Sequence, residues 1–368
     1  MENQTYIQWK KSMVRAAKKM KTPIVGHYEL TACCNLDCKM CFIHNADSNA
    51  LRARELSTET WKRIFDEAYD SGLFFAALSG GECLMRSDFE ELYLHLWKKR
   101  VRVGVLTNGT LISDGHVEFF RKYPPDFVRV SLYGCSEEGY LQVTGHKGFE
   151  KAVSAIRKLR DAKIRVSVVV TPSSYMKDEY IGIRRYCIEN GFPCQSNNFL
   201  LLKNRECPEK DDHFLSIDDI VELSKAQYEL SNGPAIPVEI TPEPHGNSKV
   251  SPKGLTCNAG AGAAVVSWDG RMYPCVMLPI GDVSLLEMSY AEAWEKTKEA
   301  VGEMLLGMEC VGCPYDDVCP KCPAMRLTGL YTGHCKPEVC ELSRRLVAAG
   351  VKKLPDPGQA VPEAESCD

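Results

Sequence analysis

The chain has 368 residues, 44% of them hydrophobic, which is enough for one large domain and a smaller one with packed cores. Its formal net charge of -4 gives no footprint for nucleic acid, and we interpret the basic stretch at residues 10–21 as a solvated helix face. No run approaches the roughly 18 apolar residues of a membrane span, and the N-terminus lacks the apolar core of a secretory signal. We therefore expect a cytoplasmic protein that binds neither membrane nor nucleic acid.

The first two hundred residues have the pattern of a parallel α/β domain. Residues 1–21 are expected to form an N-terminal helical extension, after which short apolar runs alternate with amphipathic stretches. Ser57 is expected to cap a helix in which Trp61, Ile64, Phe65, Ala68 and Tyr69 share a face, and Gly72 is expected to end it. Six strands are predicted, at residues 24–30, 73–78, 101–106, 127–132, 164–170 and 195–202.

Six such units are two short of a closed eightfold barrel. The predicted fold class is therefore α/β, with a partial (β/α)6 TIM-like barrel whose reactive groups lie at the carboxyl ends of the strands. We assign residues 22–232 to this barrel, including a helix at residues 216–230.

The C-terminal third has a different pattern, and a boundary is expected near Ala235. A hairpin is predicted at residues 265–275 with its turn at Asp269 and Gly270, followed by a helix capped by Ser289 with Glu292 as capping-box partner. We assign residues 233–350 to a linker and a small cysteine-rich domain, and residues 351–368 to a flexible tail.

Cysteine is abundant, with 18 residues in the chain. In a large chain without a secretory signal this content favours metal ligation in a reducing compartment over disulfides. Cys34, Cys38 and Cys41 follow the first predicted strand with C-x3-C-x2-C spacing. A [4Fe–4S] cluster normally takes four thiolates, so three ligands would leave one iron open to a small molecule. The alternative is a zinc or ferredoxin-type site completed by Cys33, although adjacent cysteines rarely reach the same metal.

The run C-N-L-D-C-K-M-C at residues 34–41 resembles the cysteine motif of the radical S-adenosylmethionine superfamily. The resemblance implies that Cys34, Cys38 and Cys41 hold a [4Fe–4S] cluster whose open iron chelates the methionine moiety of S-adenosylmethionine (AdoMet). An electron from a flavodoxin or ferredoxin-type donor would then cleave the sulfonium to give a 5'-deoxyadenosyl radical.

A second motif agrees with this resemblance. Ser79, Gly80, Gly81 and Glu82 follow the second predicted strand, where the family's glycine-rich edge binds the methionine amino group. Glycines let the backbone approach a ligand closely, and a carboxylate suits an ammonium group. By position, Thr107, Asn108 and Ser131 would contact the nucleoside and Met40 would pack near adenine. Tyr133 departs from the pattern, because many relatives have aspartate there.

The C-terminal cysteines resemble the SPASM extension. The pattern runs Cys257-x12-Gly270-x4-Cys275, then Cys310-x2-Cys313-x5-Cys319-x2-Cys322, and ends at Cys340. The resemblance implies two auxiliary [4Fe–4S] clusters, and three clusters in all. Cys257, Cys275 and Cys322 would hold the inner one, and Cys310, Cys313, Cys319 and Cys340 the outer one.

Two features depart from that pattern: the gap before Cys322 is one residue shorter than usual, and Cys335 is additional. The usual fourth ligand of the inner cluster is missing. Either Cys335 or Cys207 replaces it, or that iron is open. Structural zinc is the alternative, but the two C-x2-C pairs lie closer together than in a zinc ribbon.

SPASM enzymes mostly modify peptides, so the leading hypothesis is a carbon–carbon or thioether crosslink in a ribosomally made peptide. About 20 residues precede the barrel, which suggests that any leader-recognition protein is separate. The alternatives are peptide epimerisation, dehydrogenation of a sugar or cyclitol, or a zinc-stabilised interaction module. Val276 disfavours a sulfatase-maturing role, because those relatives have aspartate there. No catalytic base stands out.

Overall fold

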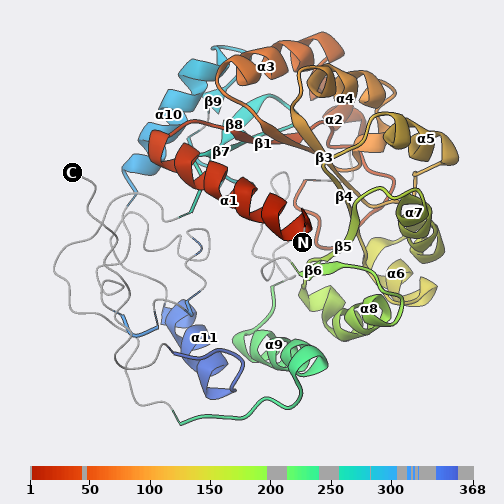
Figure 1. Ribbon diagram of the computed structural model, residues 1–368, viewed down its shortest axis with the longest axis vertical. Coiled ribbons are helices and arrows are strands. Elements are labelled where there is room, and N and C mark those ends of the chain that lie inside the picture. The colour runs from red at the N-terminus through yellow and green to blue at the C-terminus, as the bar shows by residue number, and fades with distance from the viewer. Residues whose placement is uncertain are drawn as a thin grey trace. The chain divides into compact units, whose positions relative to one another are not determined.

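The computed structural model describes residues 2–43, 48–196, 214–239, 257–281, 283–304, 313–315, 318–319, 322 and 337–354 (Figure 1). The chain divides into two compact units, which are described separately. Unit 1 comprises Met1–Leu215 and Leu255–Glu303, and unit 2 comprises Ser216–Gly254 and Met304–Asp368.

Unit 1 is built on one sheet, which has nine strands in the described residues, in the order β6-β5-β4-β3-β2-β1-β7-β8-β9. Neighbouring strands from β6 to β7 are parallel, whereas β8 is antiparallel to both β7 and β9. The strands are β1 Val25–Glu29, β2 Phe75–Ser79, β3 Arg102–Thr107, β4 Phe127–Ser131, β5 Val166–Val170, β6 Cys194–Ser196, β7 Ala263–Val266, β8 Arg271–Tyr273 and β9 Val283–Ser284.

The six predicted barrel strands are confirmed, although β6 starts one residue earlier than expected and residues 197–202 of that prediction lie outside the described residues. The sheet is open, because β6 and β9 are the ends of its order. The partial, unclosed barrel expected from six βα units is therefore present.

Helices cover the outer side of the curved strands in unit 1 (Figure 1). In α3, Trp61, Ile64, Phe65 and Ala68 are buried as the periodicity predicts. Tyr69 is 42% exposed, so its place on that face was predicted wrongly. The α-helices are α1 Glu2–Met20, α2 Ser48–Arg54, α3 Thr58–Asp70, α4 Phe89–Lys98, α5 Asp114–Lys122, α6 Glu137–Thr144, α7 Phe149–Asp161, α8 Lys177–Glu189, α9 Ile217–Asn232, α10 Tyr290–Gly302 and α11 Pro337–Ala348; two 3-10 turns are η1 Cys83–Met85 and η2 Ser174–Met176.

The hairpin predicted at residues 265–275 is present as β7 and β8, but it belongs to the barrel sheet. Strand β7 pairs in parallel with β1, with Val25 opposite Ala263. This pairing covers the edge of β1 that a six-stranded barrel would leave exposed. The capping box of Ser289 and Glu292 at the start of α10 is also present.

Helix α1 lies at the amino ends of β2 to β4. Its Trp9 ring packs edge-on against Phe74 and Phe75, and its Lys10 ammonium forms an ion pair of 3.1 Å with Asp126. The basic stretch at residues 10–21 is therefore not entirely a solvated face, because Lys10 anchors the helix to the sheet.

Unit 2 contains α9 and α11, which pack together. Arg345 of α11 forms an ion pair with Asp218 of α9, and the Val238 N–H donates to the Ala348 carbonyl at 3.0 Å. The predicted domain ranges placed α9 with the barrel and the hairpin with the C-terminal domain, so the compact units divide the chain differently. Among the described residues, none of the helices has both the length and the apolarity needed to cross a bilayer.

Candidate functional site

The cysteine loop begins at the carboxyl end of β1 and is joined there to the loop after β2. The Gly81 N–H donates to the Thr31 carbonyl at 2.7 Å, and the Glu82 N–H donates to the Cys33 carbonyl at 2.9 Å. These two backbone hydrogen bonds fix the chain immediately before Cys34. The structure thus brings the first cysteine motif and the Ser79–Glu82 motif together at one edge of the sheet.

The two glycines of this motif are required by that close approach. A Cβ on Gly80 would lie 2.3 Å from the Thr31 carbonyl oxygen, and one on Gly81 would lie 2.4 Å from the Cys33 carbonyl oxygen. Gly80 also has φ +133°, which L side chains rarely adopt. The glycines were expected to allow the close approach of a ligand, and the structure shows that they also let the two loops meet.

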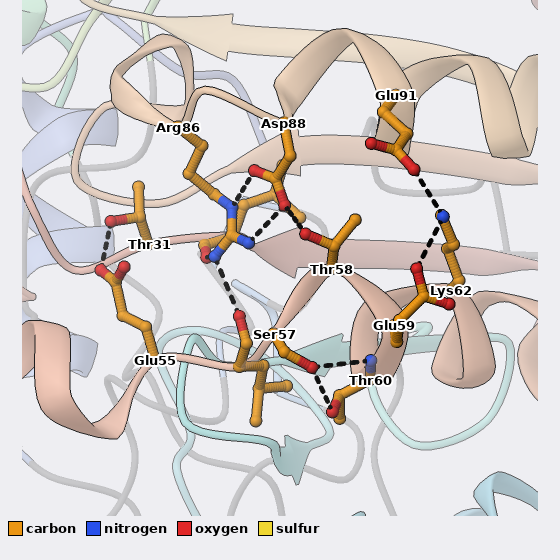
Figure 2. A network of polar contacts seen from close by, with 12 residues as sticks. Thr31, Glu55, Ser57, Thr58, Glu59, Thr60, Lys62, Arg86, Asp88 and Glu91 are labelled. Atoms are coloured by element: carbon orange, nitrogen blue, oxygen red, sulfur yellow. Dashed lines mark hydrogen bonds and ion pairs between the residues drawn. The ribbon is translucent and has the colours of Figure 1, made fainter.

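A polar network holds the end of β1 from the other side (Figure 2). The Thr31 hydroxyl and the Ala32 N–H both donate to the Glu55 carboxylate, the latter at 3.0 Å. Arg86 pairs with Asp88 at 2.7 Å and donates to the carbonyls of Leu30 and Leu56, each at 3.1 Å.

The remainder of the cysteine loop is bound to the end of α6. The Asp37 N–H donates to the Thr144 carbonyl at 2.9 Å, and the Lys39 N–H donates to the Val143 carbonyl at 3.1 Å. Thr144 is fully buried, and its hydroxyl bonds the Tyr140 carbonyl at 2.8 Å. The loop is therefore fixed on both sides of Cys34 and Cys38.

The three thiols of the loop interact electrostatically. Burial, with smaller effects of the Glu82 and Cys41 charges, raises the pKa of Cys34 to about 12. Burial also raises the pKa of Cys38, as do the charges of Cys41 and Cys34. As free thiols these groups would stay protonated at neutral pH. Bound iron would stabilise the thiolates, because a coordinating metal deprotonates a thiol outright.

Nitrogen donors surround the first thiol. The Cys34 sulfur accepts from the Leu36 N–H at 3.4 Å and from the Asn108 side-chain amide at 3.8 Å. Hydrogen bonds to cluster sulfurs are one means by which proteins tune reduction potential. No three His, Cys, Asp or Glu side chains within the described ranges gather closely enough for one metal ion. Thiolates that bind separate irons of a cluster do not need that proximity, so the donor set fits the [4Fe–4S] interpretation.

Glu82 is fully buried and connects the loops after β2 and β3. Its carboxylate accepts from the Leu84 N–H at 3.1 Å, the Asn108 N–H at 2.7 Å and the Thr107 hydroxyl at 2.8 Å. Burial raises the pKa of Glu82, and these hydrogen bonds oppose the shift. Any contact with a ligand's ammonium group would be added to these three bonds.

The other residues expected at the cofactor lie at the same edge. Asn108 is 5% exposed, and its amide donates to the Asn35 side-chain oxygen at 2.9 Å. Ser131 ends β4, and Tyr133 follows two residues later, where burial raises the pKa of its phenol. Met40 is buried at 5% exposure. The contacts of these residues with AdoMet remain predictions.

The C-terminal cysteines fall in both units. Cys257 is exposed in unit 1, and Cys275 follows β8 in a turn closed by the Leu278 N–H at 3.0 Å. Cys340 lies on α11 of unit 2. The other three described cysteines of this group, Cys313, Cys319 and Cys322, are half-buried in unit 2.

In unit 2, Tyr315, Val318 and Val347 form a small core, and Cys313 packs against it. The Cys319 N–H donates to the Tyr315 carbonyl at 2.8 Å, so the loop with these two cysteines is built around Tyr315 and contacts α11. Cys207, Cys310 and Cys335 lie outside the described residues.

Comparison with known proteins identifies the class. The family model of the radical SAM superfamily matches residues 28–187, and the SPASM iron-sulfur cluster-binding domain matches residues 257–323. Together the two models match more than half of the chain. The chain therefore belongs to the radical SAM superfamily, carries a SPASM domain and is an enzyme that binds AdoMet and iron-sulfur clusters.

Individual relatives differ in how much of the chain they match. The AdoMet-dependent heme synthase of Methanosarcina barkeri is 29% identical over 81% of this chain and 90% of its own. The PqqA peptide cyclase of Granulibacter bethesdensis is 30% identical over 38% of this chain and 37% of its own. The structure of Streptococcus suis SuiB bound to precursor peptide SuiA has a TM-score of 0.66 at 15% identity, covering 90% of this chain and 79% of that one.

Sequence reasoning missed Glu55, Arg86 and the buried Thr144 carbonyl as the groups that hold the cysteine loop. Each acts across 20 residues or more of chain. No local periodicity or motif indicates such a contact, although Arg86 and Asp88 lie four and six residues after Glu82 and could have been suspected for that reason.

Proposed function

We propose that this enzyme installs a carbon–carbon or thioether crosslink in a ribosomally made peptide. The observation that carries the proposal is the combination, in one chain, of the three-cysteine loop at a barrel edge with the SPASM cysteine pattern. The PqqA peptide cyclase is 30% identical over 38% of this chain, and SuiB, which binds a precursor peptide, shares the fold. Both support a peptide substrate.

The residues at the sheet edge have distinct proposed roles. Cys34, Cys38 and Cys41 hold the cluster, and the loop contacts from Glu82 and Thr144 fix their positions. Glu82 meets the ammonium group of AdoMet, while Asn108 and Ser131 contact the nucleoside. When bound, cluster and AdoMet supply a 5'-deoxyadenosyl radical that removes a hydrogen atom from a substrate carbon.

The C-terminal cysteines hold two auxiliary clusters in this proposal, with Cys335 or Cys207 as a possible fourth ligand of the inner one. A crosslink removes two hydrogen atoms from the peptide, so the second must leave as a proton and an electron. Auxiliary clusters fit the role of electron acceptor. A flavodoxin or ferredoxin-type donor supplies the electron for AdoMet cleavage, and we place the reaction in the cytoplasm.

The test is the mass of the product. Short open reading frames next to the gene are co-expressed with the enzyme under anaerobic conditions, and the peptides are analysed by mass spectrometry. A crosslink gives the loss of two hydrogen atoms and a linked fragment pair. An unchanged mass with deuterium incorporated from solvent would indicate epimerisation instead. Loss of two hydrogens from a sugar or cyclitol, with all peptides unmodified, would overturn the peptide assignment.

A heme-forming reaction is the second candidate. The match to the heme synthase covers 90% of that protein, far more than the match to the peptide cyclase. Incubation of the reconstituted enzyme with AdoMet and an iron porphyrin precursor would distinguish the two. Appearance of the heme absorption spectrum, dependent on AdoMet, would favour this reaction over peptide modification.

A further inference from the structure

A cavity of about 530 Å³ lies at the amino ends of β3, β4 and β5, at the edge of the sheet opposite the cysteine loop. Its volume falls within the range of small-molecule sites. The cavity belongs entirely to unit 1. The residues with charged or phenolic side chains in its lining are Tyr6, Arg102, Arg121, Asp126, Lys163 and Arg165.

The cations of this lining outnumber its carboxylates, because Asp126 is the one acidic residue among the lining residues. The Asp126 side chain is 2% exposed, and its oxygens accept from the Tyr6 hydroxyl at 2.5 Å, Lys10 at 3.1 Å and Arg102 at 3.2 Å. These three donors occupy its carboxylate. Arg121 pairs with Glu118 at 2.8 Å on the surface of α5.

The positive charges of Lys163 and Arg165 are not balanced by a carboxylate in this way. Within the parts of the chain that the structure describes, neither side chain has a hydrogen bond or an ion pair. The Arg165 guanidinium lies 5.5 Å from the ring centroid of Tyr6, and that of Arg102 lies 5.4 Å from the same ring. The Tyr6 ring is therefore a wall of the cavity with two cations close to it.

The excess of positive charge around the cavity also affects the neighbouring Arg129. Arg129 is half-buried on β4, with its guanidinium 4.4 Å from the Phe127 ring centroid. Its pKa is lowered by burial and by the charge of Arg165, and Asp126 only partly opposes this. Positive charge is thus locally in excess, although the chain as a whole has a net charge of -4. An anion placed between Lys163 and Arg165 would relieve this repulsion.

We propose that this cavity is a second binding site, for a small organic phosphate. The phosphoryl group contacts Lys163 and Arg165, and the organic part packs against Tyr6, Pro124 and Pro125. A phosphate monoester carries nearly two negative charges at neutral pH, which suits two uncompensated cations better than a carboxylate does. The aromatic and proline side chains provide the apolar contact that inorganic phosphate alone could not use.

Phenyl phosphate is a suitable probe, because it joins a phosphoryl group to a planar apolar body. Isothermal titration calorimetry in phosphate-free buffer, with the cluster-loaded full chain, is expected to show saturable binding of one phenyl phosphate per chain. Phenol, which lacks the anion, should not bind, and inorganic phosphate should bind more weakly. Arg165→Gln and Lys163→Gln should each weaken binding about tenfold to a hundredfold, as expected for a lost charge-assisted hydrogen bond.

Arg157→Gln on the exposed face of α7 is the matched control, because it removes the same charge away from the cavity and should leave the affinity unchanged. Phenylglyoxal labelling, mapped by mass spectrometry, locates the ligand: phenyl phosphate should protect Arg165 and not Arg157. Absence of saturable binding, equal affinity in the Arg165→Gln and Lys163→Gln variants, or binding only to phosphatidylglycerol vesicles would each overturn the proposal. None of these readouts depends on enzyme activity.

Discussion

Replacing Glu82 is expected to destabilise the junction between the loops after β2 and β3. The loss of stability should grow with the number of buried hydrogen-bond donors that each variant leaves without an acceptor. In Glu82→Gln, whichever way the amide turns, its NH2 faces a backbone N–H, that of Leu84 or that of Asn108. One buried donor then loses its acceptor, at a cost of about 1–3 kcal/mol. Because burial raises the pKa of Glu82, removing the buried charge offsets part of this cost. The net free energy of unfolding should fall by about 1–2 kcal/mol.

Glu82→Ala leaves three buried nitrogen or oxygen donors without the carboxylate: the N–H groups of Leu84 and Asn108 and the hydroxyl of Thr107. The Cys83 thiol, a weaker donor at 3.9 Å, also loses this acceptor but has the Leu106 carbonyl as a second one. Because losses at neighbouring sites are not additive, the expected cost is about 3–5 kcal/mol. For a domain of this size 1 kcal/mol lowers the Tm by roughly 2–4 °C, so the Ala variant should melt about 10 °C below the parent.

Anaerobic calorimetry of the cluster-loaded variants measures this series, and AdoMet affinity is measured separately. Thr107→Val is the comparison variant. It leaves the carboxylate with its two N–H partners and removes only the hydroxyl, which donates to Glu82 at 2.8 Å and accepts from the Gly109 N–H at 2.9 Å. If Glu82→Ala melts at the parent temperature, the carboxylate does not hold the two loops together. If the Gln variant loses stability while its dissociation constant for AdoMet is unchanged, Glu82 supports the loops and does not contact the ligand.

Three further results are expected. Changing Cys34, Cys38 and Cys41 together to Ala should remove about a third of the iron of a three-cluster enzyme and all formation of 5'-deoxyadenosine; cofactor cleavage by this variant would refute the first cluster site. Asp126→Ala should release α1 and speed its cleavage by trypsin. Burial alone would raise the pKa of Asp126, but its bonds to Tyr6, Lys10 and Arg102 outweigh burial and hold the pKa of the folded protein below the ordinary value of 3.8. The stabilisation by ionised Asp126 should therefore be fully present above pH 3.8 and be lost as the pH falls through the pKa of the folded state. Cys335→Ala should change the reduction potential of the inner auxiliary cluster if Cys335 is its fourth ligand, and an unchanged potential would leave Cys207 or an open iron.

The strands of the barrel could be predicted because their signals are local. Each is a short apolar run between turn residues, and the motifs at residues 34–41 and 79–82 follow two of them directly. Parallel strands place their carboxyl ends at one edge, so the meeting of these motifs followed from the fold class. The Ser57 cap and the buried face of α3 were equally local.

The pairing of β7 with β1 could not be predicted in this way. Val25 and Ala263 are neighbours across more than 230 residues, and the hairpin signal at Asp269 and Gly270 specifies only the turn. The alternation of apolar and polar residues in this hairpin does not indicate which strand of the barrel it pairs with. The position of α9 with α11 depends likewise on contacts such as the ion pair between Asp218 and Arg345, which no periodicity reports.

The two edges of the sheet in unit 1 are held by different kinds of interaction, and this decides where substitutions can separate structure from chemistry. At the carboxyl edge, backbone groups of the cysteine loop bond the loop after β2 and the end of α6, and glycines are needed because a Cβ would meet a carbonyl oxygen. A substitution at this edge therefore displaces the cysteines of the cluster, whether or not it also removes a contact with AdoMet. At the amino edge, the contacts are between the ends of long side chains around Asp126, and Lys163 and Arg165 extend from the loop before β5. Within the described ranges, the Lys163 and Arg165 side chains hold no other element, so their charge can be changed while the cysteine loop stays in place.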